Sequence, residues 1–247
     1  MLFKKQAFIF IIQIFFCAVC FAQIKDIDSL KKVLPSLQDT ARVDCLNAIF
    51  VGYYFSPIRS GNDSAIHYVN LVYEESKKIN YKHGLALAFL GKATIGNRIY
   101  NDYPQAEQMA LEAIKWFNLT SNKKEIAYAY WALSISQFRQ NKTDEALMNS
   151  KRCYEWGKKN ADEDECKFAL ETMTDIYRQR GEYDKLLEAQ QEIINSERAY
   201  DTSPDYTTHE LWVLGLMYML QEDYNTSLSF WRPLFAQGNP DYFDTWN

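Results

Sequence analysis

The sequence predicts an all-α protein built as a solenoid of stacked helix pairs. The first observation is a repeat of about 40 residues, whose anchor positions are spaced by 41, 40, 40 and 41 residues. The second is that each anchor follows a turn-like segment and opens an apolar stretch with helical periodicity. A fixed period of this size is typical of a solenoid of helical pairs. The five anchors are Ala65, Ala106, Ala146, Leu186 and Ser227.

Residues 1–22 have the composition of a secretory signal peptide. Lys4 and Lys5 precede an almost wholly apolar run, and Ala22 offers a small residue at a cleavage point. The run is short for a membrane span, and polar sequence follows it at once. We therefore expect an exported protein, periplasmic or secreted, cleaved near Ala22. An uncleaved anchor is the alternative.

The charge of the mature chain excludes one class of partner. Without residues 1–22, the remaining 225 residues carry 25 basic against 32 acidic side chains, a net charge of −7. Nucleic-acid binding needs clustered Lys and Arg, and the chain has no basic stripe. No other stretch approaches the length of a membrane helix. We expect neither a nucleic-acid partner nor membrane insertion by the mature segment.

After a lead-in helix at residues 23–38, residues 39–236 predict five helix-turn-helix units. The expected units are 39–80, 81–121, 122–161, 162–202 and 203–236. The third unit has the cleanest spacing, with a first helix at about 124–139 and a second at about 144–158. Small residues at Ala146, Ser150 and Cys153 let its two helices approach closely.

The motif positions recur in later units. On the first helices they are Leu87, Leu90-Gly91 and Thr94; Tyr130, Leu133-Ser134 and Gln137; Leu170, Met173-Thr174 and Tyr177; and Leu211, Leu214-Gly215 and Tyr218. On the second helices they are Ala106, Ala110 and Ala113; Ala146, Ser150 and Cys153; Leu186, Gln190 and Ile193; and Ser227, Trp231 and Leu234. The turns between helices read Asn101-Asp-Tyr103, Gly181-Glu-Tyr183 and Glu222-Asp-Tyr224.

On these motifs the chain resembles the tetratricopeptide repeat family over about residues 39–236. The resemblance implies a right-handed superhelical solenoid whose first helices line a concave face along which partners lie. The chain departs from the family in its longer period, about 40 rather than 34 residues, and in lacking the closing proline of each unit. Pro233 lies inside the last expected helix, where proline should kink or end it.

The resemblance also selects a candidate binding face on the first helices of the last three units. It comprises Tyr128, Trp131, Ile135, Phe138 and Arg139; Phe168, Glu171, Asp175 and Arg178; and His209, Trp212, Leu216 and Met219. Trp131 and Trp212 hold equivalent positions. Aromatic residues with a few arginines are typical of protein and peptide contact sites. The alternative is that these side chains pack between neighbouring helices.

Three cysteines, Cys45, Cys153 and Cys166, remain in the mature chain. Cys153 lies near the end of one expected helix and Cys166 near the start of the next. A disulfide between them would join the third unit to the fourth. Two small buried thiols are the alternative.

The sequence offers no catalytic or metal-binding constellation. The three histidines, His67, His83 and His209, fall in different units without metal-ligand spacing, and the H-E-x-x-H, P-loop and nucleophile-elbow motifs are missing. Acid pairs are present at Glu163 and Glu165 and at Glu171 and Asp175. A helix-capping cluster and a solvated helix face account for them better than acid–base chemistry does. We expect no cofactor and no metal.

The last residues resemble the beginning of another unit. Residues 237–240 read as a turn, and residues 241–247 (Asp-Tyr-Phe-Asp-Thr-Trp-Asn) read as the opening of a sixth first helix. We therefore expect the sequence to be the front part of a longer protein.

The functional expectation is an exported scaffold that binds a protein or peptide. The signal ending in Ala-Gln and the long Tyr-, Asn- and Lys-rich repeats resemble exported tetratricopeptide regions of Bacteroidota, which commonly precede a sensor histidine kinase or DNA-binding regulator. That resemblance implies the sensory part of a signal-transduction protein. A glycan-binding outer-membrane accessory protein is the alternative, although it would need a better lipid-attachment cysteine and large insertions. An enzyme ranks third.

Overall fold

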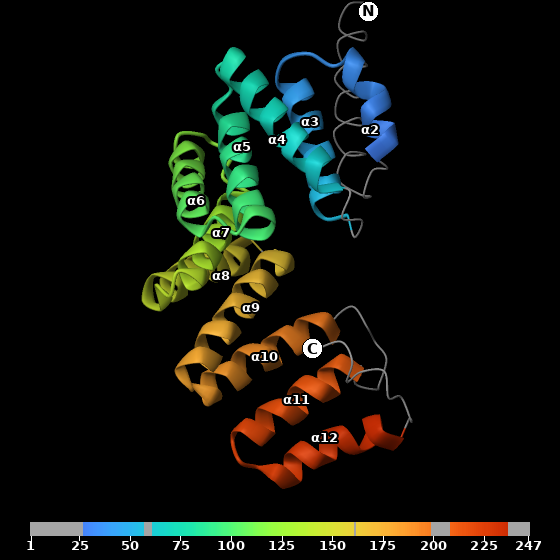
Figure 1. The fold of residues 1–247 in the computed structure, drawn as a ribbon, viewed down its shortest axis with the longest axis vertical. Coiled ribbons are helices and arrows are strands. Elements are labelled where there is room, and N and C mark those ends of the chain that lie inside the picture. Colours follow the sequence, from blue (N-terminus) through green and yellow to red (C-terminus); the bar gives the residue numbers. More distant parts are fainter. Residues whose placement is uncertain (1–26, 57–60, 161, 199–207, 237–247) are drawn as a thin grey trace, which may run out of the picture. The chain divides into compact units, whose positions relative to one another are not determined.

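The fold is entirely helical in the residues that the structure, a computed structural model, describes: 27–56, 61–160, 162–198 and 208–236. In these ranges the chain forms eleven α-helices and no strand (Figure 1). The predicted all-α class is confirmed. The predicted signal peptide and the predicted start of a sixth unit lie outside the described residues.

The helices follow one another with short connections. Their bounds are α2 Ile27–Val33, α3 Asp39–Tyr54, α4 Gly61–Lys78, α5 Lys82–Ile95, α6 Tyr103–Asn118, α7 Ile126–Arg139, α8 Thr143–Asn160, α9 Glu163–Arg180, α10 Tyr183–Arg198, α11 Thr208–Leu220 and α12 Tyr224–Ala236. A 3₁₀ turn, Leu34–Ser36, follows α2, and a π-helix, Gly96–Tyr100, extends α5. The chain divides into two compact units, residues 1–123 and 124–247.

In the first unit each helix from α2 to α6 packs against the next, and α3 also contacts α5. Its core is carried by apolar residues of α3, α4 and α5. The buried members are Val43, Leu46, Phe50, Tyr54, Ala65, Val69, Val72, Ala88 and Ile95.

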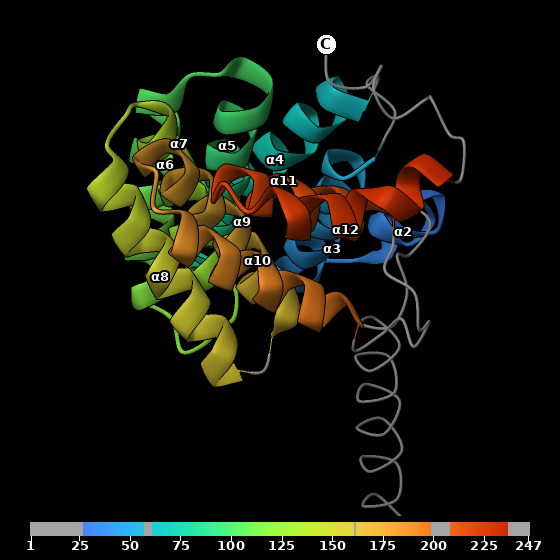
Figure 2. The ribbon, with the colours of Figure 1, turned by 90° about the horizontal axis from the view of Figure 1, so that it is seen from below.

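In the second unit the same rule holds from α7 to α12 (Figures 1 and 2). The first helices of neighbouring pairs, α7 and α9, also touch. Each second helix, α8 or α10, therefore lies between its own first helix and the next one. This packing of consecutive helices is the arrangement that the 40-residue period predicts.

The turns inside the helix pairs repeat as regularly as the anchors. Asn101, Asn141, Gly181 and Glu222 all have a left-handed backbone, with φ between 54° and 68°. In the last three turns the residue that follows the left-handed one donates its N–H to the carbonyl five residues back. These bonds are Lys142 to Gln137, Glu182 to Tyr177 and Asp223 to Tyr218, at 2.9–3.0 Å. This Schellman motif closes the first helix and reverses the chain.

The turn at Asn101 differs by one residue. Asp102 donates to the carbonyl of Gly96, six residues back, at 3.1 Å. The π-helix Gly96–Tyr100 accounts for the extra residue, because its wider turn absorbs an insertion without breaking the helix.

The repeat anchors mark the first hydrogen bond of each second helix. The N–H groups of Ala106, Ala146, Leu186 and Ser227 donate to Asp102, Lys142, Glu182 and Asp223 at 2.9–3.1 Å. All five anchors, Ala65 included, are buried. A small side chain at most anchors therefore sets how closely the paired helices approach.

Pro233 does not end the last helix. The helix α12 continues through it to Ala236. A proline in the final turn removes only the hydrogen bond to the carbonyl of Ser229, and the neighbouring bonds of the turn remain available.

Candidate functional site

The structure distributes the predicted face over three helices of the second unit. The α7 members are Tyr128, Trp131, Ile135, Phe138 and Arg139; the α9 members are Phe168, Glu171, Asp175 and Arg178; the α11 members are His209, Trp212, Leu216 and Met219. Arg139, Glu171 and Arg178 are exposed, and the other members whose side chains are described are half-buried. The side chain of His209 lies outside the description.

Three aromatic members come together on α7 and α9. The Trp131 ring lies 4.9 Å from the Phe168 ring with an interplanar angle of 32°, and the Tyr128 ring lies 6.1 Å from Phe168. Offset aromatic pairs at these distances attract beyond their buried area. We call Tyr128, Trp131 and Phe168 the α7–α9 aromatic cluster. It couples two successive first helices and keeps part of its surface exposed.

The cluster rests on a core of small residues. Trp131 packs against Ala127, Cys153 and Ala169, which are fully buried. The packing alternative therefore holds for part of the Trp131 surface, because the indole both fills this space and contacts Phe168.

Trp212, at the equivalent position of α11, packs differently. Its ring stacks on Trp231 of α12 with a centroid distance of 5.5 Å and an interplanar angle of 24°. Trp231 Nε1 donates to the Trp212 carbonyl at 3.2 Å. Trp212 therefore holds α11 to its own partner helix and is not joined to Trp131 in one surface.

The residues opposite explain the difference. Trp231 occupies the position that Ser150 holds in α8, and it fits because Gly215 faces it: a Cβ on Gly215 would lie 2.0 Å from Trp231 Nε1. In α7 the position of Gly215 is taken by Ser134, which is buried. With serines at both positions, α8 offers Trp131 no indole to stack on.

The charged members of the face are mostly solvated. Arg178 Nη1 contacts Asp175 Oδ1 at 2.8 Å, one turn apart on α9. Exposed pairs of this kind contribute little to stability. Arg139 and Glu171 add one exposed charge of each sign, so the face carries no dominant sign.

A buried carboxylate adjoins the aromatic cluster. Glu165 lies one turn before Phe168 and is only 1 % exposed, and neither carboxylate oxygen has a hydrogen-bond partner among the described residues. Burial, the Asp162 carboxylate and, more weakly, Glu125 raise the pKa of Glu165 to about 7, against the opposing effect of Lys124. Glu165 is therefore partly protonated at neutral pH.

The same surroundings change the pKa of Tyr128. Burial, together with the carboxylates of Asp162 and Glu165, raises the pKa of Tyr128 above its ordinary value, so that the phenol stays neutral. Asp162 itself is the N-cap of α9, and its side chain accepts from the Glu165 N–H at 3.2 Å. The capping side chain is that of Asp162, whereas Glu165, one acid of the pair expected in a helix-capping cluster, is a buried acid that its place in an acidic run concealed.

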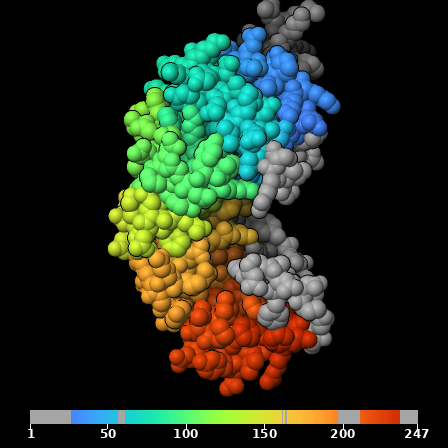
Figure 3. All heavy atoms as spheres, viewed as in Figure 1, coloured from blue at the N-terminus to red at the C-terminus, as the bar shows by residue number. Residues whose placement is uncertain are grey.

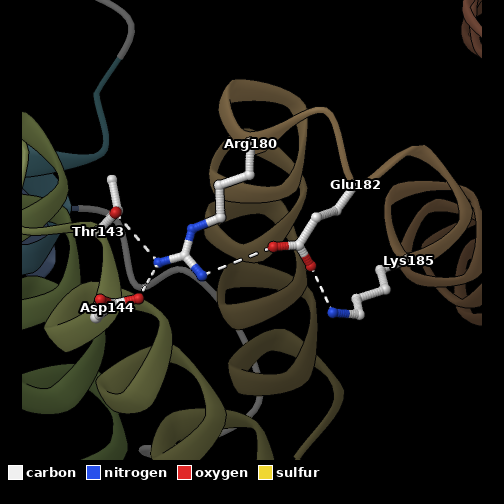
Figure 4. Close-up of polar contacts among 5 residues, drawn as sticks. All are labelled: Thr143, Asp144, Arg180, Glu182 and Lys185. Atoms are coloured by element: carbon white, nitrogen blue, oxygen red, sulfur yellow. Dashed lines mark hydrogen bonds and ion pairs between the residues drawn. The ribbon is translucent and has the colours of Figure 1, made fainter.

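Successive turns are joined by a series of hydrogen bonds and ion pairs, here called the polar ladder. The sequence motifs did not predict it. Arg180 Nη2 donates to Thr143 Oγ1 at 3.1 Å and to Asp144 Oδ1 at 2.5 Å (Figure 4). Its Nη1 lies 3.7 Å from Glu182, which also pairs with Lys185. The end of α9 is thereby tied to the start of α8.

The same register recurs one pair later. Gln221 Nε2 donates to Asp184 Oδ1 at 3.2 Å. Gln221 is equivalent to Arg180, and Asp184 to Asp144. The available signal was an Asp two residues before the anchor, with a long polar side chain at the end of the first helix of the next pair.

The three cysteines of the described chain are free thiols. Cys153 donates to the Glu165 carbonyl and Cys166 to the Tyr154 carbonyl, at 3.5 and 3.9 Å, so the two residues face each other's helix. Burial raises the pKa of both thiols, which keeps them protonated and unreactive. A disulfide between them stays a prediction.

The residues that the structure describes contain no candidate metal-binding or acid–base catalytic site. They contain no group of three or more His, Cys, Asp or Glu side chains placed to hold a metal ion. Glu171 is exposed and Asp175 pairs with Arg178, so this acid pair has solvated surroundings. No described helix is long and apolar enough to cross a membrane.

No protein-family model matches the chain, and no curated protein is significantly similar to it.

Proposed function

We propose that this chain is a helical-repeat scaffold that binds a protein or peptide, and that the α7–α9 aromatic cluster is its contact surface. The observation that carries the proposal is the partly exposed group of Tyr128, Trp131 and Phe168 on two successive first helices. Rigid aromatic side chains give large contact area at small entropic cost, and they dominate protein recognition sites.

The surroundings of the cluster suit an extended or helical peptide. Exposed Glu171 lies one turn after Phe168, and exposed Arg139 and Arg178 lie about two and three turns beyond the cluster along α7 and α9. Border charges steer and orient a partner, while the buried centre supplies most of the affinity.

The decisive experiment selects peptides from a displayed library on the purified protein and measures their affinity for variants. Trp131→Ala should weaken a selected peptide at least about tenfold, which corresponds to about 1.4 kcal/mol. Trp156→Ala is the matched control, because Trp156 of α8 packs on the same core of Ala127, Cys153 and Ala169. Equal weakening by both variants, or a failure to select any peptide, would contradict the proposal.

We further propose that residues 39–236 form five tetratricopeptide-like units in a right-handed superhelix. The support is the equal spacing of the left-handed turn residues and of the buried anchors. An experimental structure that shows a left-handed path, or a different pairing of helices, would refute this description.

We also propose export, on the composition of residues 1–22. Expression in a bacterium followed by N-terminal sequencing should give a mature chain that begins near Gln23. The role as the sensory part of a signal-transduction protein is supported by the resemblance alone. Sequencing the reading frame downstream of Asn247 tests it, because a membrane helix and a kinase should follow.

A further inference from the structure

Acidic side chains border the α7–α9 aromatic cluster on both of its helices. On α9, Asp164 lies one turn before Phe168 and Glu171 one turn after it, and both acids are exposed. Half-buried Glu125, which directly precedes α7, lies one turn before Tyr128. Residues three or four positions apart are neighbours on a helix surface, so each acid lies on the same side as a ring of the cluster. We call Glu125, Asp164 and Glu171 the acidic border.

A buried carboxyl group lies beside this border. Glu165 is 1 % exposed, and neither of its oxygens has a hydrogen-bond partner among the described residues. Burial, and then the carboxylates of Asp162 and Glu165, raise the pKa of Tyr128, so these acids lie close to the phenol. A buried carboxylate without a hydrogen bond is stabilised by a positive charge nearby. A cation at the Tyr128 end of the cluster would therefore stabilise the ionised form of Glu165.

The basic residues of α7 and α9 do not balance the acidic border. Lys124, which precedes α7, offsets part of the negative charge at the buried acid. Lys167 directly precedes Phe168 and therefore lies about 100° round the helix from it. Exposed Arg139 and Arg178 lie about two and three turns beyond the cluster. The predicted face as a whole has no dominant sign, whereas the surroundings of the aromatic cluster are negative.

Aromatic rings and carboxylates together suit a positively charged group. Ring faces attract Lys and Arg side chains, and the attraction is stronger where water is excluded. The helices that carry these groups pack together, α7 on α9 and both on α8, and in Figure 3 the yellow and orange surfaces of this part of the second unit are continuous. Charge complementarity therefore favours a basic partner over an acidic one.

We propose that the α7–α9 aromatic cluster binds a peptide segment that carries a Lys or Arg side chain beside its apolar contact, and that the carboxylates of Asp164 and Glu165 attract this cation. The inference rests on the proposed function and specifies the chemistry of the partner. Asp164 acts at the surface, and Glu165 acts from the interior through its charge.

The first test compares two forms of the peptides selected on the purified protein, each acetylated at its N-terminus. One form has the selected sequence, and in the other every Lys and Arg is replaced by Gln. The selected peptides should be richer in Lys and Arg than the library, and the Gln form should bind at least about tenfold more weakly at low salt. High salt should reduce this difference.

The outcomes separate this inference from the proposed function. Peptides that need Trp131 for binding and bind equally well in the Gln form would overturn the basic partner and leave the peptide-binding scaffold standing. A selection that yields no peptide would overturn both.

The second test removes one charge of the acidic border. Asp164→Asn should weaken the basic form about threefold, as expected for an exposed ion pair, and leave the Gln form unchanged. Glu145→Gln is the matched control, because Glu145 is an exposed acid in the first turn of α8 and its loss changes the net charge equally. Equal weakening of the basic form by both variants, or of both peptide forms by Asp164→Asn, would overturn the proposal.

The third test is the pH dependence of binding. The titratable groups that surround Glu165 are Lys124, Glu125 and Tyr128 on the α7 side, Cys153 on α8, and Asp162 at the start of α9. Burial raises the pKa of Glu165 to about 7, and a bound cation favours its ionised form. The basic form should therefore bind more tightly as pH rises from about 6 to about 8, and the Gln form should not. A dependence that persists unchanged in Glu165→Gln would overturn the role of Glu165.

Discussion

Trp131 and Trp212 occupy the same position of the repeat and stabilise different junctions. Trp131 reaches across to Phe168 on the next first helix, whereas Trp212 stacks on Trp231 of its own partner helix. The cause lies on the helix opposite, where Ser150 in one pair is replaced by Trp231 in the other. The repeat position thus fixes where the residue lies on its helix. The residue on the facing helix determines which neighbour its side chain packs against.

The largest effect should follow from filling the space opposite Trp231. Gly215→Ala places a Cβ 2.0 Å from Trp231 Nε1, so the indole must move. Overpacking of this kind costs about 2–3 kcal/mol. Urea denaturation measures the loss.

Ser134→Ala at the equivalent position is the control. Ser134 Oγ bonds only within its own helix, to the Trp131 carbonyl at 2.7 Å, so its removal should cost less than about 1 kcal/mol. Adding Trp231→Ala to Gly215→Ala should recover part of the loss, since it removes the clash. Equal losses for Gly215→Ala and Ser134→Ala would break the comparison.

The next largest effect is the stability lost when either tryptophan is removed, and it should appear in a different helix for each. Trp131→Ala and Trp212→Ala should each cost about 2 kcal/mol, less than a fully buried tryptophan, because both are half-buried. Hydrogen exchange should quicken in α9 for the first variant and in α12 for the second. The same pattern of exchange in both variants would show that the two junctions are not distinct.

A smaller effect depends on pH. The pKa of Glu165 is raised from 4.5 to about 7, so the folded state binds more protons than the unfolded state between these values. Stability is therefore greatest below about pH 4.5 and falls as pH rises from there through 7.

Urea denaturation at several pH values checks this linkage. In Glu165→Gln the fall should be lost, while Asp164→Asn, a change at an exposed neighbour, should retain it. An unchanged pH dependence in Glu165→Gln would mean that Glu165 is ionised at neutral pH in the folded state.

The smallest effect concerns the polar ladder. Arg180→Ala removes the contacts with Thr143, Asp144 and Glu182 and should cost about 1 kcal/mol. Gln221→Ala removes one neutral donor to Asp184 and should cost about half as much. High salt should weaken the first effect and not the second, which thermal melts at two ionic strengths would reveal.

Much of the fold could be predicted from the 40-residue repeat. The third pair was expected at about 124–139 and 144–158, and α7 and α8 span Ile126–Arg139 and Thr143–Asn160. Helical spacing and turn residues are local signals, so a single sequence carries them. For Pro233 the sequence left two outcomes, a kink or the end of the helix, because a proline effect depends on how many turns follow it; α12 continues to Ala236.

The candidate binding face could be predicted only in part from the sequence. The sequence places Trp131 and Trp212 on first helices, and it cannot say which ring each will meet. Glu165 looked like one acid of a capping run, and its burial became visible only when α7, α8 and α9 were packed together. Burial is a property of neighbours that are distant in the chain.

The sequence by itself determined the helical class, the anchor positions and the turns, because these depend on residues within about one helical turn of each other. Tertiary structure decided which aromatic rings meet and which acid is removed from water. Each of these depends on the size and charge of a side chain on another helix, which no local pattern records.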